Sequence, residues 1–543
     1  MRAPGCGGRL AGITYYKSGC DLHDRRKDDL RTTRNRRGAA LRPLAAALAF
    51  TAAPSLLPAA TIFQPGELEG HGVTTREDGT PLATALQAWH LDALSHAVPP
   101  SPNTTIRPVT NCDDDGEGSL RAVVAASASG DTIDLGALTC SAITLETGAI
   151  AVRLDSATIV GPATHALAID GHGYDRVFLH YGAGSFVLRD LTVKNGHHRA
   201  TRFNVGVGGC IASAGYLTLD HSVVTGCYAG GEGAYGGAIY AYSLLMSAST
   251  LSNNNAYGSH IENSTAAFGG AAFVYQIDMV DSTVTGNVAR HQVNPPRSNY
   301  DIGGGIVTIR GGLVVGSTID SNFAYDVAGG LASFGNLHIR NSTISGNVTE
   351  TFGGGGLFVR YRARVEITSS TITGNTGPKG AGIFLTTDGG SIDSSIVAGD
   401  HAGDGTEIFG TRTFAFDGAN NMIGVVSATI AVPADTIATA DPGLQPLAYN
   451  GGPTRTHALR LDSVAIDAGN NASDLPSDQR GGGFARVVGA AADIGAFEFD
   501  ARAGDGTARI PVPVLSHWAI ALLLACLAAI GIRSTRRRRP NDD

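Results

Sequence analysis

The middle of the chain repeats the same short block of residues many times. The block has the sequence Ser-Thr-(Val/Ile/Leu)-x-x-Asn, and a glycine-rich step that leads into an aliphatic residue lies 10 to 13 residues before each copy. Clear copies begin at Ser249, Ser282, Ser317, Ser342 and Ser370, and degenerate copies begin at Leu191, Ser222 and Ser394. Successive copies begin 24 to 35 residues apart. Such self-similarity predicts a solenoid, in which each repeat packs only against its neighbours.

Aliphatic residues recur at fixed positions of this repeat. They lie two residues after the block start, three before it and five before it, where Gly312 is the exception. The positions three and five before the start share one strand face, because side chains alternate along a strand. Stacked coils therefore bury continuous aliphatic columns, which predicts an all-β, right-handed parallel β-helix over residues 141–440. The 73 glycines and the low charged content of 16% also favour short strands joined by tight turns.

A column of asparagines follows the block start by five residues, at Asn254, Asn287, Asn322, Asn347 and Asn375. Asparagine tolerates the left-handed turn conformation, and stacked amides can hydrogen-bond along a column. Because the residue repeats with the coil, we predict that the column is structural and not a binding site.

The extra length of the longer repeats falls after the asparagine, for example at 255–268, 288–303 and 323–328. Insertions on one side of a solenoid form loops, and loops carry recognition residues. Tyrosine with mixed charge suits a polar surface that binds sugars. Solvated loops without a partner are the alternative. The predicted ligand-binding residues are Tyr257, His260, Arg290, His291, Tyr300, Asp301 and Tyr325, and the same loops carry Glu262, Arg297 and Asp326.

Enzymes also use parallel β-helices, so the predicted fold does not decide the function. Polysaccharide lyases and glycoside hydrolases need clustered carboxylates on neighbouring coils. Asp281 and Asp393 are predicted to share one column, but several coils separate them. We therefore expect no catalytic residues and favour a non-catalytic adhesin or glycan-binding protein. A lyase or hydrolase of the pectin-lyase-like fold and a structural surface spacer are the alternatives.

The charge of the central body argues against nucleic acid as a partner. Between residues 61 and 509 the chain has 24 Lys and Arg against 42 Asp and Glu, a balance of −18. Phosphate binding requires a basic surface instead.

An acidic segment precedes the repeats and is assigned to an N-terminal cap over residues 106–140, after a linker at 61–105. Ser119 is placed to cap a short helix from Ala122 to Ala128, and a first strand follows. The segment resembles the D-x-G-x-G-S-L-R entry of many bacterial surface β-helix proteins. The spacing of Asp113, Asp115 and Glu117 could also supply oxygen ligands for calcium. We favour the turn and cap over the metal site.

Four cysteines lie in the body, at Cys112, Cys140, Cys210 and Cys227. They allow three pairings, of which 112–140 and 210–227 are the most local. Disulfides suit an exported protein, and free buried thiols are the alternative.

Both ends of the chain have the pattern of targeting signals. Residues 1–60 contain Arg34, Arg36 and Arg37 before the apolar stretch 44–57, which indicates a leader and secretory signal peptide. Near the C-terminus, an apolar run at 518–532 precedes an arginine cluster, which predicts a short membrane helix with its end in the cytoplasm.

The residues in front of this run, Val512-Pro513-Val514-Leu515-Ser516-His517-Trp518, resemble the IPTL-CTERM sorting signal. Pro513, Leu515, Ser516 and Trp518 match the family pattern. The resemblance of residues 512–543 implies processing by an exosortase-type enzyme in a Gram-negative bacterium. It implies initial anchoring in the inner membrane and display at the cell surface or outer membrane.

A different block occupies residues 441–500, before a linker at 501–511. It contains Asn450-Gly451-Gly452-Pro453-Thr454, Ala465-Ile466-Asp467-Ala468-Gly469, Asp478-Gln479-Arg480-Gly481 and Asp493-Ile494-Gly495-Ala496-Phe497. These motifs resemble the choice-of-anchor Q module, which ends a β-helix before an anchoring signal. The resemblance implies surface display, and we assign His457 and Arg480 a capping role.

Overall fold

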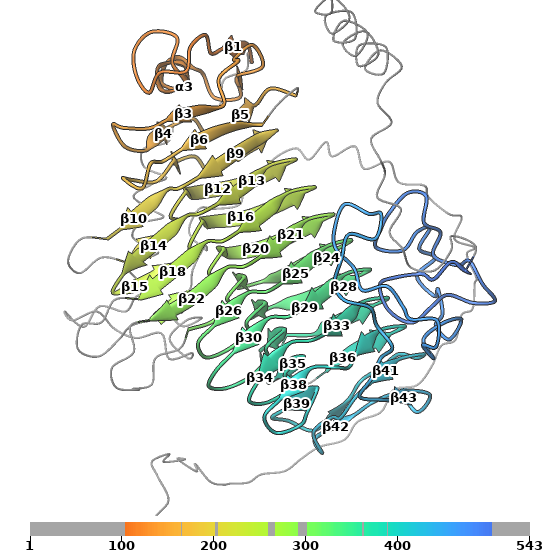
Figure 1. Cartoon of the computed structure of the whole chain (residues 1–543). Helices are drawn as coiled ribbons and strands as arrows, with labels where there is room; N and C mark the ends of the chain where they lie inside the picture. Colours follow the sequence, from red (N-terminus) through yellow and green to blue (C-terminus); the bar gives the residue numbers. More distant parts are fainter. Residues whose placement is uncertain are drawn as a thin grey trace, which may run out of the picture. The chain divides into compact units, whose positions relative to one another are not determined.

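The computed structural model describes residues 104–163, 166–200, 205–258, 266–291, 301–360, 363–387 and 389–501. Within these ranges the chain forms a parallel β-solenoid of about 10 turns (Figure 1). The predicted all-β class and parallel coil are confirmed. The predicted signal peptide at 1–60, most of the linker at 61–105 and the C-terminal apolar run lie outside the described residues.

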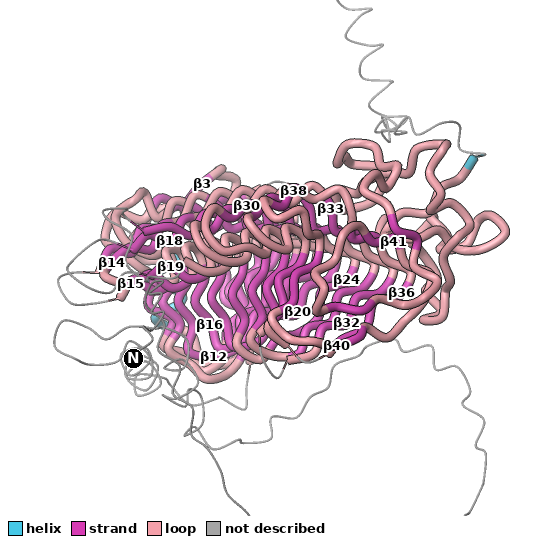
Figure 2. The backbone as a smooth tube through the Cα atoms, turned by 90° about the horizontal axis from the view of Figure 1, so that it is seen from below, coloured by secondary structure: helices cyan, strands magenta, loops and turns pink. Residues whose placement is uncertain are grey.

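One coil illustrates the order of strands. In it β23 (Ile306–Thr308) and β24 (Gly311–Val315) belong to one large sheet, and β25 (Thr318–Asp320) to a second. The coil continues with β26 (Phe323–Ala324) in a third sheet, and β27 (Leu331–Ser333) begins the next coil. Each strand pairs in parallel with its equivalent in the neighbouring coils, so the strands run side by side along the solenoid (Figure 2).

The sheets have the following strands among the described residues. The first sheet has 18 strands: β1 (Ile106–Pro108), β2 (Thr132–Asp134), β4 (Ile150–Val152), β5 (Ala157–Val160), β7 (Phe178–His180), β8 (Ser185–Arg189), β12 (Ile211–Asp220), β16 (Ile239–Ser247), β20 (Ala272–Val280), β23, β24, β27, β28 (Asn336–Arg340), β31 (Leu357–Val359), β32 (Val365–Thr368), β35 (Ile383–Leu385), β36 (Gly390–Asp393) and β39 (Ile408–Gly410). The second has 12: β3 (Ala142–Thr144), β6 (Leu167–Asp170), β9 (Leu191–Lys194), β13 (Val223–Thr225), β17 (Thr250–Ser252), β21 (Thr283–Thr285), β25, β29 (Thr343–Ser345), β33 (Thr371–Thr373), β37 (Ile396–Val397), β41 (Met422–Ile423) and β43 (Ile437–Ala438).

The third sheet has eight strands: β10 (His197–Arg199), β14 (Tyr228–Gly231), β18 (Asn255–Gly258), β22 (Val288–His291), β26, β30 (Val348–Thr349), β34 (Thr376–Gly377) and β38 (His401–Ala402). One small sheet contains β11 (Gly206–Val207), β15 (Gly233–Tyr235) and β19 (Ala266–Phe268), and a second contains β40 (Phe414–Ala415) and β42 (Ile430–Ala431).

The segments interpreted from sequence as plain inserted loops contain strands of the third sheet, which is a correction. These strands are short and rich in alanine and glycine, so they lack the aliphatic alternation that marks the other two sheets.

The predicted aliphatic columns form the core. Their members pair coil to coil in register and are at most 1% exposed: Leu219, Met246, Met279, Val314, Ile339 and Ile367 in one column, and Val224, Leu251, Val284, Ile319, Ile344 and Ile372 in another. The glycine at position 312 is required by close backbone packing. A Cβ there would lie 1.7 Å from the carbonyl oxygen of Ile277, and its φ of +145° is one that other residues rarely adopt.

The asparagine column is a buried hydrogen-bonded ladder at the corner between the second and third sheets. The Nδ2 atom of each asparagine donates to the side-chain oxygen of the next rung, at 2.8–3.0 Å, and the last rung is Asp400. The structural role and the hydrogen-bonded stacking of the amides are confirmed, but the predicted left-handed conformation of the asparagines was wrong. The left-handed residue is the one before each rung, such as Asn253 or Ser321, and not the rung itself.

A second ladder, of serines, follows the corner between the first and second sheets. The backbone N–H of each serine donates to the hydroxyl of the next at 3.0–3.2 Å, through Ser222, Ser249, Ser282, Ser317, Ser342, Ser370 and Ser395. The last copy of the block therefore starts at Ser395 and not at Ser394.

Asp393 pairs with Thr368, one position away from the column of Asp281. The predicted shared column of these two carboxylates was wrong.

The N-terminal cap contains the helix α3 (Leu120–Ala126), and Ser119 caps it by accepting a hydrogen bond from the backbone N–H of Ala122. Asp114 ties the cap to the first coil. Its carboxylate lies 2.6 Å from Arg121 and accepts hydrogen bonds from the backbone N–H groups of Glu146 and Thr147. Two disulfides form, Cys112–Cys140 and Cys210–Cys227, which are the two most local pairings.

Residues 441–500 do not simply extend the stack of coils. They fold back along the flank of the solenoid, over the outer face of the second sheet (Figure 1). Gln479 is the central contact, because its Oε1 accepts from Thr343 and its Nε2 lies within hydrogen-bond distance of Thr318 and Thr454. Contacts of Arg455 with Asp320 at 2.5 Å and of His457 with Ser345 at 2.8 Å extend the interface.

Candidate functional site

A line of aromatic and cationic side chains crosses the outer face of the third sheet, on β10, β14, β18 and β22. We name it the strip and define it as His197, Arg199, Tyr228, Tyr257 and Arg290. Strand register places Arg199 beside Gly230, then Tyr257, then Arg290 on successive coils, and places His197 beside Tyr228. The strip follows the solenoid axis for four coils along the side where β10, β14, β18 and β22 lie (Figure 1).

The rings of the strip contact one another from coil to coil. The centroids of His197 and Tyr228 are 4.5 Å apart, those of Tyr228 and Tyr257 are 6.3 Å apart, and the guanidinium of Arg290 lies 5.9 Å from the Tyr257 ring. Gly230 makes this arrangement possible. A Cβ there would lie 2.5 Å from the Tyr228 ring, so only glycine lets that ring lie across the neighbouring position.

The charged and polar groups of the strip mainly offer hydrogen-bond donors to a ligand. His197 is half-buried, and burial followed by the charge of Arg199 lowers its pKa, which favours the neutral imidazole. Burial raises the pKa of the Tyr228 hydroxyl, while Arg199 and Arg290 lower it, so both cations act on the same ring. Both arginines are exposed, and no carboxylate within the described ranges forms an ion pair with either.

A surface pocket of about 360 Å³ lies at the N-terminal end of the strip. Its side-chain lining includes His172 and Asn195 together with His197 and Tyr228 of the strip. The volume is at the small end of the range for ligand pockets. The pocket and the strip therefore form one continuous surface.

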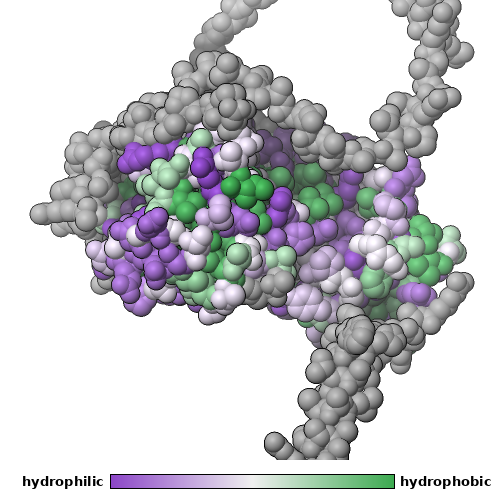
Figure 3. Space-filling view, turned by 90° about the horizontal axis from the view of Figure 1, so that it is seen from above, coloured by the Kyte–Doolittle hydropathy of each residue, from purple (hydrophilic) through white to green (hydrophobic). Residues whose placement is uncertain are grey.

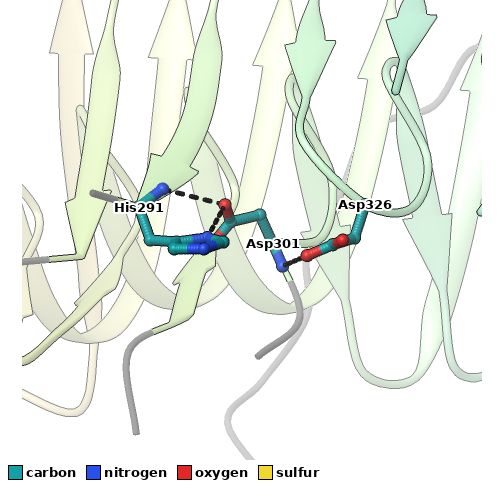
Figure 4. Close-up of side chains that lie close together, drawn as sticks. All are labelled: His291, Asp301 and Asp326. Carbon is teal, nitrogen blue, oxygen red and sulfur yellow. Dashed lines mark hydrogen bonds and ion pairs between the residues drawn. The ribbon is translucent and has the colours of Figure 1, made fainter. Parts of the chain in front are cut away.

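A second group of residues lies on the other side of β22, beneath the strip. His291 follows Arg290 and points the opposite way, and its Nδ1 lies 2.6 Å from Oδ2 of Asp301 (Figure 4). The backbone N–H of His291 donates to the same oxygen at 2.8 Å. In the next coil, Asp326 accepts a hydrogen bond from the backbone N–H of Asp301 at 2.8 Å. We name these three residues the clasp, because His291 and Asp301 join the two ends of the segment 292–300.

The clasp residues could hold a metal ion, since one ligand atom from each lies within 4.8 Å of the others. Nitrogen and oxygen ligands of this kind suit zinc or a related transition metal. Asp301 and Asp326 already accept hydrogen bonds from Ala267 and Thr351 as well as those above. The hydrogen bond to Asp301 raises the pKa of His291, and burial raises the pKa of Asp326. A protonated His291 balances part of the buried negative charge, so the clasp is complete as an ion pair.

The predicted ligand-binding residues thus divide into two groups. Tyr257 and Arg290 belong to the strip, whereas His291 and Asp301 belong to the clasp, and Tyr325 contacts the His291 ring edge-on at 5.3 Å. His260 and Tyr300 lie outside the described residues. His197, Arg199 and Tyr228 were missed, because their coils carry shorter insertions. The register of the third sheet, which no sequence pattern revealed, is what aligns them with Tyr257.

The predicted calcium ligands Asp113, Asp115 and Glu117 are not brought together as a group of three ligand atoms in the described part of the chain. Asp115 accepts a hydrogen bond from the backbone N–H of Gly116, as in a turn. The calcium role of these residues stays a prediction.

On the face shown in Figure 3, apolar side chains are interspersed with polar ones instead of forming one broad area. Among the described residues no helix is both long enough and apolar enough to cross a membrane. The apolar run at 518–532 is not among those residues.

The C-terminal tail gives the decisive comparison with known families. Residues 510–539 match the IPTL-CTERM motif. The predicted sorting tail is confirmed, and this tail implies export, attachment at the cell surface and processing by an exosortase-type enzyme. The match does not reach residues 441–500, whose resemblance to the choice-of-anchor Q module stays a prediction. No curated protein and no solved structure matches the chain.

Proposed function

We propose that this exported β-helix protein is a non-catalytic adhesin that binds an extracellular polysaccharide along the strip. The observation that carries the proposal is the alignment of His197, Tyr228 and Tyr257 with Arg199 and Arg290 on consecutive coils. The IPTL-CTERM tail supports an extracellular partner, because it implies that the body is displayed at the cell surface.

The repeat of the strip suits a polymer better than a small ligand. Adjacent strands lie about 4.8 Å apart, so the strip presents polar groups at a short, regular interval along the solenoid. Tyrosine and arginine are enriched at recognition surfaces, since they combine a flat apolar body with hydrogen-bond donors. A polysaccharide that lies along the axis would meet the pocket at one end and Arg290 near the other.

The carboxylates near the strip support a non-catalytic role. Hydrolases need two accessible carboxyl groups on either side of the bond to be cleaved. Asp301 and Asp326 are close together, but they are 0% and 4% exposed and accept backbone hydrogen bonds. These two groups are therefore better suited to joining coils than to attacking a glycan.

A glycan array probed with the full chain in detergent tests this proposal, with each bound glycan recovered for mass analysis. We expect binding that Tyr228→Ala and Tyr257→Ala each weaken. The control is Tyr449→Ala, because Tyr449 is 63% exposed in the C-terminal module and far from the strip in sequence. Shortened or unsaturated glycans would support a lyase or hydrolase instead. Absence of binding to every glycan would favour a structural spacer.

A further inference from the structure

The two arginines of the strip lie on the same sheet of a body with a balance of −18. Some arginines of the described ranges form ion pairs with nearby carboxylates, such as Arg189 with Asp220 at 2.7 Å and Arg121 with Asp114 at 2.6 Å, whereas others, such as Arg340 on the first sheet, form none with a described residue. Arg199 and Arg290 form no such pair with a described residue, although both are exposed. Unpaired cations in an acidic protein leave a local positive potential, which attracts anions.

The arginines also lie on the first and last coils of the strip, with the two tyrosine rings on the coils between them. Arg199 lies two residues after His197 on β10, so both point to the outer face. Arg290 lies three coils after Arg199, and its guanidinium lies over the ring of Tyr257 in the coil before it. Two carboxylates flank the pocket residues His172 and Gly173 in the sequence. Asp170 lies 3.3 Å from Lys194 and accepts hydrogen bonds from Asn195, and Asp175 accepts hydrogen bonds from the backbone N–H groups of Ala149 and Arg176. The surface that a ligand would meet is therefore rich in donors.

On these grounds we infer that the strip and its pocket recognise an acidic polysaccharide, with Arg199 and Arg290 each pairing with a carboxylate of a uronic acid residue. This inference rests on the proposed glycan-binding function and specifies its substrate class. The planar guanidinium pairs with a carboxylate through two parallel hydrogen bonds, which a neutral hydroxyl cannot reproduce. The hydroxyls of Tyr228 and Tyr257, which lie between the arginines, are placed to donate to the sugar hydroxyls.

A matched set of probes separates this inference from glycan binding in general. Uronic-acid oligosaccharides are compared with the same oligosaccharides after methyl esterification of every carboxyl group, which keeps the size and hydroxyl pattern but removes the charge. Affinity for the full chain is measured by calorimetry at low and high salt. We expect each acid to bind about tenfold more tightly than its ester at low salt, the effect of one strong charged pair. Salt should reduce this difference.

Variants locate the effect. Arg199→Gln and Arg290→Gln should each lower the affinity for the acids by a larger factor than the affinity for the esters, so that each variant narrows the difference between acid and ester. The control is Arg340→Gln, because Arg340 is an exposed arginine on β28 in the first sheet. Equal affinity for acids and esters would overturn the inference and leave the proposed glycan binding intact. If neither acids nor esters bind, the inference and the proposed function both fail.

Discussion

The side-chain nitrogen of Asn375 donates a 2.9 Å hydrogen bond to Oδ1 of Asp400, which ends the asparagine ladder with a carboxylate. The second oxygen of Asp400 is buried close to the carboxylate of Glu407 and accepts no hydrogen bond from a described residue. Burial, followed by the charge of Glu407, raises the pKa of Asp400 well above its usual range. Every earlier rung from Asn254 onward is an amide, so the last rung is the one that responds to pH.

Asp400→Asn should therefore stabilise the protein. An amide keeps the acceptor for Asn375, removes the buried charge and presents an N–H donor to the carboxylate of Glu407. The gain should be about 1–3 kcal/mol, the cost of a buried polar atom without a partner. Because the folded pKa of Asp400 is raised, its favourable contribution is present at low pH and is lost as the pH rises. The gain should thus be larger at pH 8 than at pH 4 in denaturant unfolding. The control, Asp417→Asn, alters an 83% exposed side chain and should change little.

Glu498 should make the C-terminal module sensitive to pH. Burial raises the pKa of its carboxyl to about 7, although the backbone N–H groups of Asp493 and Val488 donate to it. A carboxyl group with a raised folded pKa stabilises the fold below its unfolded pKa of 4.5, and this contribution is lost as the pH rises towards 7.

We expect Glu498→Gln to remove this dependence, so that the variant gains about 2 kcal/mol relative to the natural chain between pH 4 and pH 8. Thermal unfolding of both chains across this pH range measures the difference. A constant difference at every pH would show that Glu498 does not titrate in the folded protein.

Gln479 should hold the module against the flank of the solenoid. Its side chain is 1% exposed, and it has hydrogen-bond contacts with Thr343, Thr318 and Thr454. Gln479→Ala leaves these buried groups without a partner and should cost about 2–4 kcal/mol. Hydrogen exchange should then increase in residues 441–500 and much less in the core columns. Gln276→Ala, at an exposed position of β20, is the matched control.

The clasp should weaken as the pH rises, because the pKa of His291 is raised by Asp301. A protonated histidine with a raised folded pKa stabilises the fold below its unfolded pKa of 6.5, and the contribution is lost as the pH rises through the folded value. His291→Ala should therefore increase amide exchange around Ala267, whose N–H donates to Asp301, more at pH 6 than at pH 9. A rise in the unfolding temperature on adding Zn²⁺, abolished by Asp326→Asn, would show instead that the clasp is a metal site.

The aliphatic columns could be predicted because each coil places one residue type at a fixed distance from the Ser-Thr block. Gly312 was an unexplained exception in the sequence, and only the 1.7 Å approach of the Ile277 carbonyl oxygen explains it. The register of the last coil was misjudged, because Ser394 and Ser395 are adjacent and only the hydrogen bond from Ser370 identifies the ladder member.

The strip could be predicted only in part. Tyr257 and Arg290 lie in insertions that could be recognised from the repeat. His197 and Tyr228 lie in coils with shorter insertions, so they were not selected as candidates. Their alignment depends on a sheet built from Ala229, Ala256 and Ala289, whose small side chains give no periodic signal. Arg455 contacts Asp320, a residue 135 positions away in the sequence. Local sequence patterns cannot predict such a long-range contact.

The most direct test of the account is hydrogen exchange of the full chain with and without a bound acidic oligosaccharide. The account predicts protection in the peptides that carry β10, β14, β18 and β22, centred on Tyr228 and Tyr257, with no change along the first sheet. Protection along the first sheet, or at the C-terminal module alone, would contradict the assignment of the strip as the binding surface.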